Sequence, residues 1–265
     1  MARPGEPERP VTRDAAYFDH WYADMAASPA RDAIVARTLG LPPELQSTSL
    51  LPWPGIATVT EALGLPPDGL LADVACGRGG YGLEIAARTG ASLVGVDFAA
   101  EALRQARELA QHIGIAADFR VGDLAATGLD AGSADGVLCV DAIQFAVKPD
   151  AAYRELRRIL TPGGRVVLTC WEAVDKTDRR VSDRIRSVDL GAGLAAAGFD
   201  NVEVREQTAW RDNERAMWEE AAALDPGGDP ALQSLHDEGV RVLPQLDLTR
   251  RVMATATAPG STSAG

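Results

Sequence analysis

Lysine is almost absent from this chain, which has only Lys148 and Lys176 among 265 residues. We therefore do not expect catalysis through a lysine Schiff base. Acidic residues outnumber basic ones by 38 to 26, and the formal net charge is −12. Because affinity for nucleic acid depends on clustered Lys and Arg, this balance argues against a nucleic-acid partner. Arg180, Arg184 and Arg186 are interspersed with acidic residues, and we predict that they form a solvent-exposed face.

Cysteine and histidine are also scarce, with three of each. The odd number of cysteines, all in or beside apolar runs, predicts reduced, buried thiols in a cytoplasmic protein. His20, His112 and His236 are far apart, and no C-x-x-C or H-x-x-x-H spacing occurs. We therefore expect no metal site.

Long apolar runs are missing as well, since none approaches the roughly 20 residues that cross a bilayer. Residues 1–12 are polar and proline-rich, unlike a signal peptide. No membrane partner is expected, and a homodimer stays open.

The most informative stretch is residues 70–82, LLADVACGRGGYG. The apolar run predicts a buried strand, the glycine cluster a tight turn, and residues 81–88 the helix that follows. A second apolar run ends in Asp97. Glycines allow a ligand to approach the backbone closely, and a carboxylate at a strand tip can accept from both hydroxyls of a ribose. These features predict a nucleotide-type site.

Other motifs indicate which nucleotide. Gly77, Gly79 and Gly82 spell G-x-G-x-x-G, a pattern that alone is typical of dinucleotide sites. Asp73 lies inside the first strand, Asp123 ends a later apolar run, and residues 160–168 join a helix to a strand through Pro-Gly-Gly. Together and in this order, these motifs resemble the class I S-adenosylmethionine-dependent methyltransferases of the small-molecule, natural-product type. The resemblance covers roughly residues 54–256.

The resemblance implies that S-adenosylmethionine is the cofactor and that ten residues bind it: Asp73, Ala75, Cys76, Gly77, Gly79, Asp97, Phe98, Asp123, Leu124 and Asp141. The turn at 75–79 would hold the methionine part, and Asp97 the ribose hydroxyls. Phe98 would pack on the adenine, and Asp123 would accept from its amino group beside the Leu124 backbone. Asp141 would lie under the sulfonium. Asp73 also suits a structural role, bonding the turn backbone.

Strands and helices alternate along most of the chain. We predict strands near 70–75, 92–97, 117–122, 136–141, 164–171, 201–207 and 249–256. Helices are predicted near 80–89, 99–113, 150–160, 188–198, 212–224 and 229–240. This alternation predicts an α/β fold with a Rossmann-like, seven-stranded, mostly parallel sheet and helices on both faces.

Four segments follow from this reading. Residues 1–12 and 258–265 are expected to be disordered tails. Residues 13–64 are predicted to form an N-terminal helical lid, in which Ser28 caps a helix that begins at Pro29 and ends at Gly40. Residues 65–257 form the cofactor-binding domain, with a helical cap inserted at about 208–248.

The acceptor must be recognised by parts outside the shared core. Residues 17–22, YFDHWY, carry four aromatic side chains in the lid, and aromatic faces suit a sulfonium. Phe18, Trp21 and Tyr22 can equally anchor the lid by packing. In the cap, Trp210, Met217 and Trp218 are at least as well explained by packing as by acceptor contacts. Trp171 and Glu172 are further candidates for the cavity wall.

Two residues are candidates for catalysis. His20 lies in the predicted lid, and its imidazole could take a proton near neutral pH. Gln144 lies where similar proteins often carry a histidine, and its amide could orient an acceptor hydroxyl or carbonyl but cannot act as a base. His112 is expected away from the cleft, whereas His236 could face either way.

The favoured function is methyl transfer to a small organic acceptor, O-methylation in secondary metabolism, although C- or N-methylation fits the residues equally well. One alternative is a protein of the same fold that binds the cofactor but performs other chemistry, such as cyclisation. A weaker alternative is a nicotinamide dehydrogenase, which the lack of a Tyr-x-x-x-Lys pair opposes.

Overall fold

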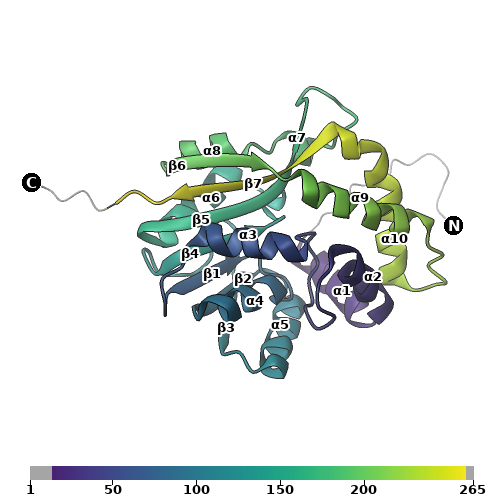
Figure 1. Ribbon diagram of the computed structural model, residues 1–265, viewed down its shortest axis with the longest axis horizontal. Helices are drawn as coiled ribbons and strands as arrows, with labels where there is room; N and C mark the ends of the chain where they lie inside the picture. The colour runs from purple at the N-terminus through teal and green to yellow at the C-terminus, as the bar shows by residue number, and fades with distance from the viewer. Residues whose placement is uncertain (1–13, 261–265) are drawn as a thin grey trace, which may run out of the picture.

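A seven-stranded sheet forms the centre of the computed structural model, which describes residues 14–260. Its strands are β1 (Leu70–Val74), β2 (Ser92–Asp97), β3 (Ala117–Val121), β4 (Ala134–Val140), β5 (Leu160–Ala173), β6 (Asp200–Glu206) and β7 (Thr249–Thr257). Their order is β3-β2-β1-β4-β5-β7-β6 (Figure 1). β1 to β5 are parallel to one another, and β7 is antiparallel to both β5 and β6. The predicted mostly parallel, Rossmann-like sheet is confirmed.

Helices cover both faces of this sheet. On one face lie α3 (Trp53–Leu63), α4 (Gly80–Thr89) and α5 (Ala100–Ile113), which share one apolar cluster with the sheet. On the other lie α6 (Pro149–Ile159) and α8 (Leu190–Ala196), within a second cluster. In α5, Leu103, Ala106 and Ala110 are buried at the three- and four-residue spacing of an amphipathic helix.

Two groups of helices outside the sheet lie against each other (Figure 1). We call α1 (Ala15–Ala26) and α2 (Pro29–Leu39) the lid helices. The cap consists of α9 (Thr208–Ala223), α10 (Pro230–Val242) and the 3-10 helix η2 (Leu243–Leu248). α2 packs on α9, and α1 packs on α10.

The helices of the predicted N-terminal lid, 13–64, pack in two places. Helix α3 packs against β4, β5 and α4. Ile56, Val59 and Leu63 recur at helical spacing on its buried face, which fixes it to the sheet. Of the tails predicted at 1–12 and 258–265, residues 1–12 and 261–265 lie outside the described range, whereas Ala258 is buried and its amide donates to the Gly164 carbonyl at 2.8 Å.

The start of α2 follows the predicted signals in part. Pro29 occupies the first helical position, and Gly40 ends the helix in a left-handed conformation with φ 66°. Ser28 was predicted to cap the helix, but its side chain makes no capping hydrogen bond. Its hydroxyl instead donates to Asp229 Oδ2 at the start of α10, at 2.6 Å. A residue predicted to act locally therefore ties the lid to the cap.

Other differences are small. β5 begins at Leu160 rather than near 164, because Ala134 pairs with Leu160 before the register shift in the β4–β5 ladder. The short helices η1 (Ile143–Phe145) and α7 (Asp183–Arg186) were not predicted.

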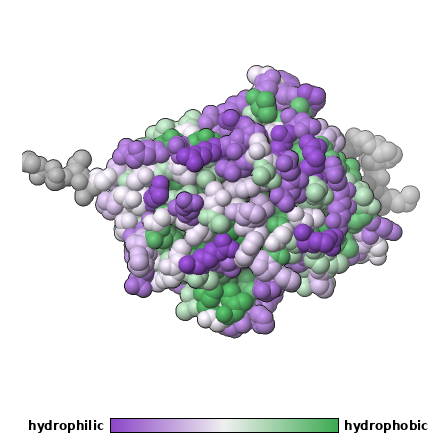
Figure 2. All heavy atoms as spheres, in the orientation of Figure 1, coloured by the Kyte–Doolittle hydropathy of each residue, from purple (hydrophilic) through white to green (hydrophobic). Residues whose placement is uncertain are grey.

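The surface of the edge strand β6 is polar. Asp200, Glu203, Arg205 and Glu206 are exposed on it, and Figure 2 shows hydrophilic residues over this part of the molecule. Charges on an edge strand oppose pairing with another strand. Across residues 14–260, no helix combines the length and apolar character needed to span a membrane.

Candidate functional site

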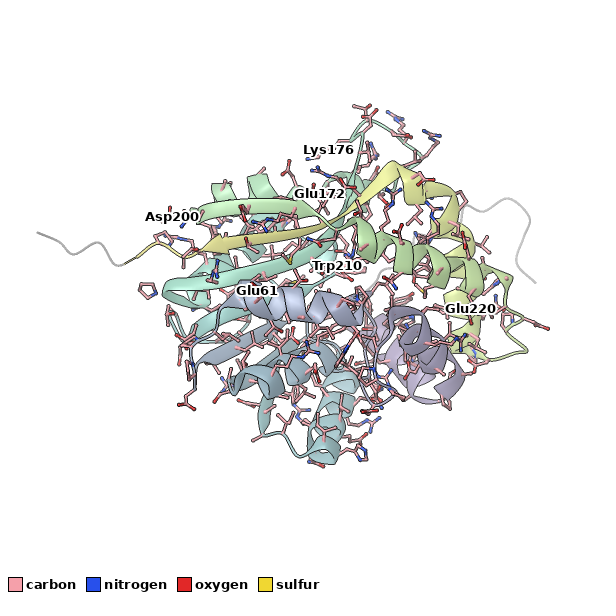
Figure 3. All side chains as sticks on the ribbon, in the orientation of Figure 1. Glu61, Glu172, Lys176, Asp200, Trp210 and Glu220 are labelled. Atoms are coloured by element: carbon pink, nitrogen blue, oxygen red, sulfur yellow. The ribbon has the colours of Figure 1, made fainter. Side chains whose placement is uncertain are left out.

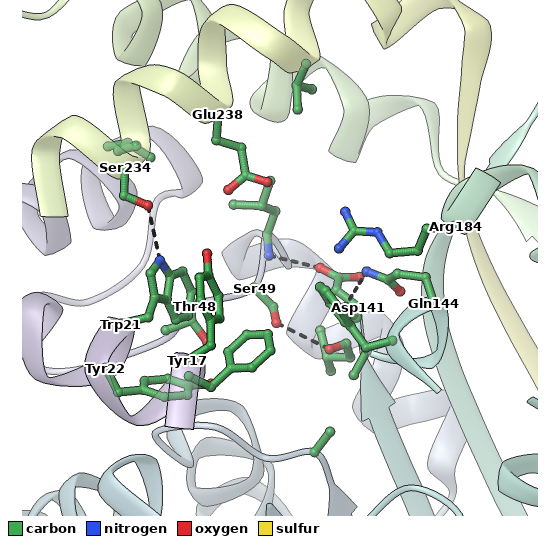
Figure 4. A pocket seen from close by; sticks show the side chains of 18 of the residues that line it. Tyr17, Trp21, Tyr22, Thr48, Ser49, Asp141, Gln144, Arg184, Ser234 and Glu238 are labelled. Carbon is green, nitrogen blue, oxygen red and sulfur yellow. Dashed lines mark hydrogen bonds between the residues drawn. The ribbon is translucent and has the colours of Figure 1, made fainter. Parts of the chain in front are cut away.

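A cavity of about 910 Å³ lies between the lid helices, the cap and the ends of the parallel strands. Open α/β sheets bind ligands outside the carboxyl ends of their strands, and residues following β1, β2, β3 and β4 line this cavity. Figure 4 shows its side chains converging from α1, α10 and the strand ends. Its volume lies in the range of small-molecule sites.

Asp97, at the tip of β2, provides the most defined polar group on the nucleotide side. Its side chain lines the cavity and is only 4% exposed. Oδ2 accepts from the Gly77 amide at 2.8 Å, and Oδ1 from the Ala99 amide at 2.9 Å. Burial raises the pKa of this carboxyl, although these amide hydrogen bonds oppose the shift. Each oxygen keeps acceptor capacity for a ligand hydroxyl, so the site fits a ribose.

Three more predicted residues lie beside it. Phe98, Asp123 and Leu124 all line the cavity. Asp123 Oδ1 accepts from the Ala125 amide at 2.8 Å, which fixes the carboxylate after β3. The Phe98 ring meets Phe18 of α1 edge to face, with centroids 5.3 Å apart. An aromatic face and a carboxylate acceptor in this arrangement can hold a purine and its amino group.

The glycine turn reaches the cavity through Ala75, whereas Cys76, Gly77 and Gly79 are not among the lining residues. A Cβ at Gly77 would lie 2.8 Å from the Tyr22 hydroxyl, and one at Gly79 would lie 3.1 Å from Phe119. The glycines therefore permit close packing of the lid and of β3, and their contact with the cofactor stays a prediction.

Asp73 also lies behind this turn rather than in the cavity. A Cβ at Gly82 would lie 2.6 Å from Asp73 Oδ2, so glycine is needed for α4 to pack against this carboxyl. Burial raises its pKa to about 7, and the negative charge of Asp97 adds to the shift. The structural alternative for Asp73 agrees with this geometry.

The aromatic segment of α1 lines the cavity. Tyr17, Phe18, Trp21 and Tyr22 all contribute to its wall. Phe18 is central, because it meets Phe98 and also Phe145, at 5.7 Å between centroids. Burial raises the pKa of Tyr22 far above its usual range. The segment therefore both anchors the lid and forms the wall, which the sequence left as alternatives.

Several hydrogen bonds hold the lid in place. Trp21 Nε1 donates to Ser234 Oγ on α10 at 3.2 Å (Figure 4). Gln105 Nε2 on α5 donates to the Tyr22 carbonyl at 2.9 Å. Arg78, in the glycine turn, donates to Asp32 Oδ2 on α2 at 2.7 Å. The lid is thus joined to the cap, to α5 and to the turn.

Asp141 forms the floor of the cavity, and its carboxylate is held by a buried arginine. Arg251 of β7 donates to Asp141 Oδ1 at 2.5 Å and to Oδ2 at 2.9 Å. Thr169 donates to Oδ1 at 2.7 Å, and the Leu50 amide donates to Oδ2 at 3.0 Å. Asp141 has a left-handed backbone with φ 56°. It lines the cavity as predicted, but much of its acceptor capacity is used by the protein.

The same arginine reaches the cap. Arg251 Nε lies 3.0 Å from Glu214 Oε1 of α9, and both side chains are fully buried. Trp171 Nε1 donates to Glu214 Oε2 at 2.8 Å, and Arg251 lies over the Trp171 ring at 4.3 Å. Burial raises the pKa of Glu214 to about 7 despite the attraction of Arg251. Arg251 is shared, because Asp141 already takes both of its terminal nitrogens, so its attraction offsets only part of the effect of burial.

Sequence reasoning missed Glu214 and Arg251. Trp171 lines the cavity, as anticipated, but Glu172 does not. Glu172 Oε1 accepts from the Leu190 amide at 2.8 Å, and Oε2 accepts from Arg250 at 2.6 Å. Figure 3 labels Glu172 near the upper end of β5, among the strands. It links β5 to α8 and β7.

Of the cap residues singled out by sequence, Trp218 lines the cavity. Trp210 and Met217 are buried in the core cluster instead. Figure 3 shows Trp210 at the start of α9, beside α3. A Cβ at Gly55 of α3 would lie 3.0 Å from this indole.

The two candidate catalytic residues lie in different surroundings, and their roles stay predictions. His20 is exposed and is not among the cavity side chains, because it lies on the outer face of α1. Gln144 does line the cavity. However, its amide nitrogen donates to the Asp141 carbonyl at 2.7 Å, and its oxygen accepts from Cys170 Sγ at 3.0 Å. Gln144 therefore braces the loop after β4.

The other histidines and the cysteines add no reactive group. His112 is exposed, and neither it nor His236 lines the cavity. All three cysteines are unpaired, and burial raises the pKa of each thiol. Within residues 14–260, no group of three or more His, Cys, Asp or Glu side chains could hold a metal ion.

The prediction that Arg184 lies on a solvent-exposed face is wrong. Arg180 is 72% exposed and paired with Asp178, as predicted. Arg184 instead lines the cavity and lies over the Phe145 ring, with 4.4 Å from Cζ to the ring centroid. No sequence pattern distinguished the two arginines, because both lie in the same charged segment.

Comparison with known proteins identifies the core of this site. Residues 72–168 match a family model described as a methyltransferase domain. The ubiquinone biosynthesis O-methyltransferase of Xanthomonas axonopodis pv. citri is 30% identical over 166 residues, which cover 60% of this chain and 67% of that protein. Sterol 24-C-methyltransferase of Saccharomyces cerevisiae is 28% identical over 136 residues, or 49% of this chain and 36% of that enzyme.

Solved structures extend the likeness to the lid and the cap. A phosphoethanolamine N-methyltransferase 2 from Haemonchus contortus has a TM-score of 0.72 at 18% identity, covering 91% of this chain and 60% of its own. The cyclase SpnF has the same TM-score and identity, covering 95% of this chain and 98% of its own. At these identities the likeness shows the fold alone.

Proposed function

Since this chain belongs to the class I S-adenosylmethionine-dependent methyltransferase family, we propose that it methylates an oxygen atom of a small organic acceptor in secondary metabolism. The observation that carries this proposal is the 910 Å³ cavity, which joins a nucleotide-binding edge to a wall of aromatic and aliphatic side chains. The 30% identity to a ubiquinone O-methyltransferase supports oxygen as the methylated atom. The unpaired cysteines support a cytoplasmic location.

The residues that line the nucleotide edge fit the cofactor. We propose that Asp97 accepts from its ribose hydroxyls, that Phe98 packs on the adenine, and that Asp123 accepts from the adenine amino group. S-adenosylmethionine supplies a methyl group already activated by its sulfonium charge. The rings of Phe18, Tyr22 and the other lid aromatics suit that charge.

The protein's main task is then to orient the acceptor and exclude water. The lid hydrogen bonds to α5, α10 and the glycine turn serve this purpose, as does the apolar wall. Asp141 would form the floor beneath the reacting groups, held in place by Arg251.

The side chains that line the cavity also indicate which kind of acceptor hydroxyl is methylated. No histidine, cysteine or lysine side chain lines it in the described part of the chain, so that the bases available there are mainly carboxylates, which are weak bases. An alcohol needs a general base near neutral pH, whereas a phenol or an enol ionises more readily. We therefore propose an acidic hydroxyl as the methylated group.

A cofactor-binding cyclase is the second candidate, because the likeness to SpnF spans nearly the whole of both chains.

One experiment distinguishes the methyltransferase from the cyclase. Purified protein is titrated calorimetrically with S-adenosylhomocysteine and then incubated with S-adenosylmethionine and a panel of phenols, enols and alcohols. A gain of about 14 Da in a phenol or enol supports the proposal. A product of unchanged mass supports cyclisation, and methylation of alcohols alone contradicts the acidic-hydroxyl assignment.

A further inference from the structure

The segment after β5 brings a cation to the cavity wall. Residues 174–189 include the short helix α7, where Val181, Arg184 and Ile185 line the cavity. Arg184 lies against the Phe145 ring face, and this contact orients a planar guanidinium. Figure 4 shows the Arg184 side chain extending into the cavity from the side opposite Trp21 and Ser234.

The sheet order places Arg184 away from the nucleotide edge. Asp97 and Asp123 follow β2 and β3, which lie on one side of β1. Phe145 and α7 follow β4 and β5, on the other side. With the cofactor on the β2–β3 side, Arg184 faces the part of the cavity that is left for the acceptor.

The surroundings of Arg184 suit a ligand that is mainly apolar. Val181 and Ile185, on the same segment as Arg184, also line the cavity, and a charge pair is stronger where water is excluded.

We propose that Arg184 binds an anionic group of the acceptor, either a carboxylate or an ionised acidic hydroxyl, on a largely apolar skeleton. This inference rests on the proposed function, because it assigns the acceptor side of the same cavity. A guanidinium presents a fork of donors that matches an anionic oxygen pair, which makes Arg184 a specificity-determining residue.

Two probes of the same shape test this without knowledge of the acceptor. Protein saturated with S-adenosylhomocysteine is titrated with anilinonaphthalene sulfonate and, separately, with the uncharged N-phenylnaphthylamine. Wild-type protein should bind the sulfonate more tightly. Arg184→Gln should weaken sulfonate binding by about tenfold, the lower range for a charge-assisted hydrogen bond, with little change for the uncharged probe. Arg184→Lys, which keeps the charge but not the fork, should give an intermediate loss.

The control is Arg180→Gln, which removes the same charge from the same segment at a site outside the cavity. It should leave both affinities unchanged. Equal binding of the two probes by wild-type protein would overturn the inference. So would an equal loss of both probes in Arg184→Gln, or an equal loss of the sulfonate in Arg180→Gln. Failure of S-adenosylhomocysteine itself to bind would instead contradict the proposed function.

Discussion

Replacement of Glu214 by glutamine should change how the stability of the protein depends on pH. Glu214 is fully buried, and its pKa is raised to about 7 from an ordinary value of 4.5. Between these values the folded protein keeps the proton that the unfolded chain has lost. Unfolding therefore releases a proton, and the free energy of unfolding falls as pH rises. The stabilising contribution of the protonated carboxyl is complete below pH 4.5, its ordinary pKa in the unfolded chain. It is lost as the pH rises to about 7, its pKa in the folded protein.

The magnitude follows from the shift. The slope is about 1.4 kcal/mol per pH unit, so Glu214 should lower the free energy of unfolding by roughly 2 kcal/mol between about pH 5.5 and about pH 7.5. Glu214→Gln removes this titration and keeps an oxygen that can accept from Trp171. The variant should be more stable than wild-type protein by about 1 kcal/mol at the lower pH and by about 3 kcal/mol at the higher one.

Urea denaturation of both proteins at the two pH values measures this difference. Glu219→Gln is the matched control, because it changes the same residue type on an exposed position of α9 and should keep the wild-type slope. If Glu214 were instead ionised and firmly paired with Arg251, the glutamine variant would lose about 3 kcal/mol or more at both pH values. The inference that Arg251 is shared would be refuted if the variant kept the wild-type pH dependence and its free energy of unfolding fell by this amount.

Three further predictions concern the site and the fold. Asp97→Asn should weaken S-adenosylhomocysteine binding about tenfold or more in calorimetry, since it removes a charged acceptor; unchanged affinity would contradict the ribose assignment. His20→Ala should leave that affinity and the melting temperature unchanged, because the side chain is exposed. Gly193→Ala should destabilise the protein by roughly 1–3 kcal/mol in urea denaturation, because its Cβ would lie 2.2 Å from the Tyr153 ring. Gly191→Ala, in the same helix with its nearest neighbour at 3.3 Å, should cost less.

The sequence indicated site residues where a short local pattern also marks the end of a strand. Asp97 and Asp123 could be placed because each ends an apolar run, and the ends of parallel strands meet at one edge of the sheet. The sequence located the glycine turn but not the lid side chain that packs on it. What fills the space beside Gly77 is a hydroxyl from α1, which no pattern within residues 75–79 can indicate.

Contacts between distant segments were beyond sequence reasoning. Asp141 and Arg251 are 110 positions apart, and nothing in the strand sequence TRRVMATAT distinguishes Arg251 from its neighbour Arg250. Arg184 lies in a charged segment that resembles solvated surface, and only the folded path of residues 174–189 turns it towards Phe145. Pairings of this kind depend on tertiary packing.

The thiols of Cys139 and Cys170, which are buried, and of Cys76, which is partly buried, make the protein well suited to site-specific labelling. Alkylating reagents react with the thiolate, and the raised pKa of each thiol keeps that form rare. A cysteine introduced at an exposed position of the lid, such as His20→Cys, should react with a maleimide dye far faster than the native thiols. The wild-type background would not need to be stripped of cysteine before the opening of the lid is followed by fluorescence.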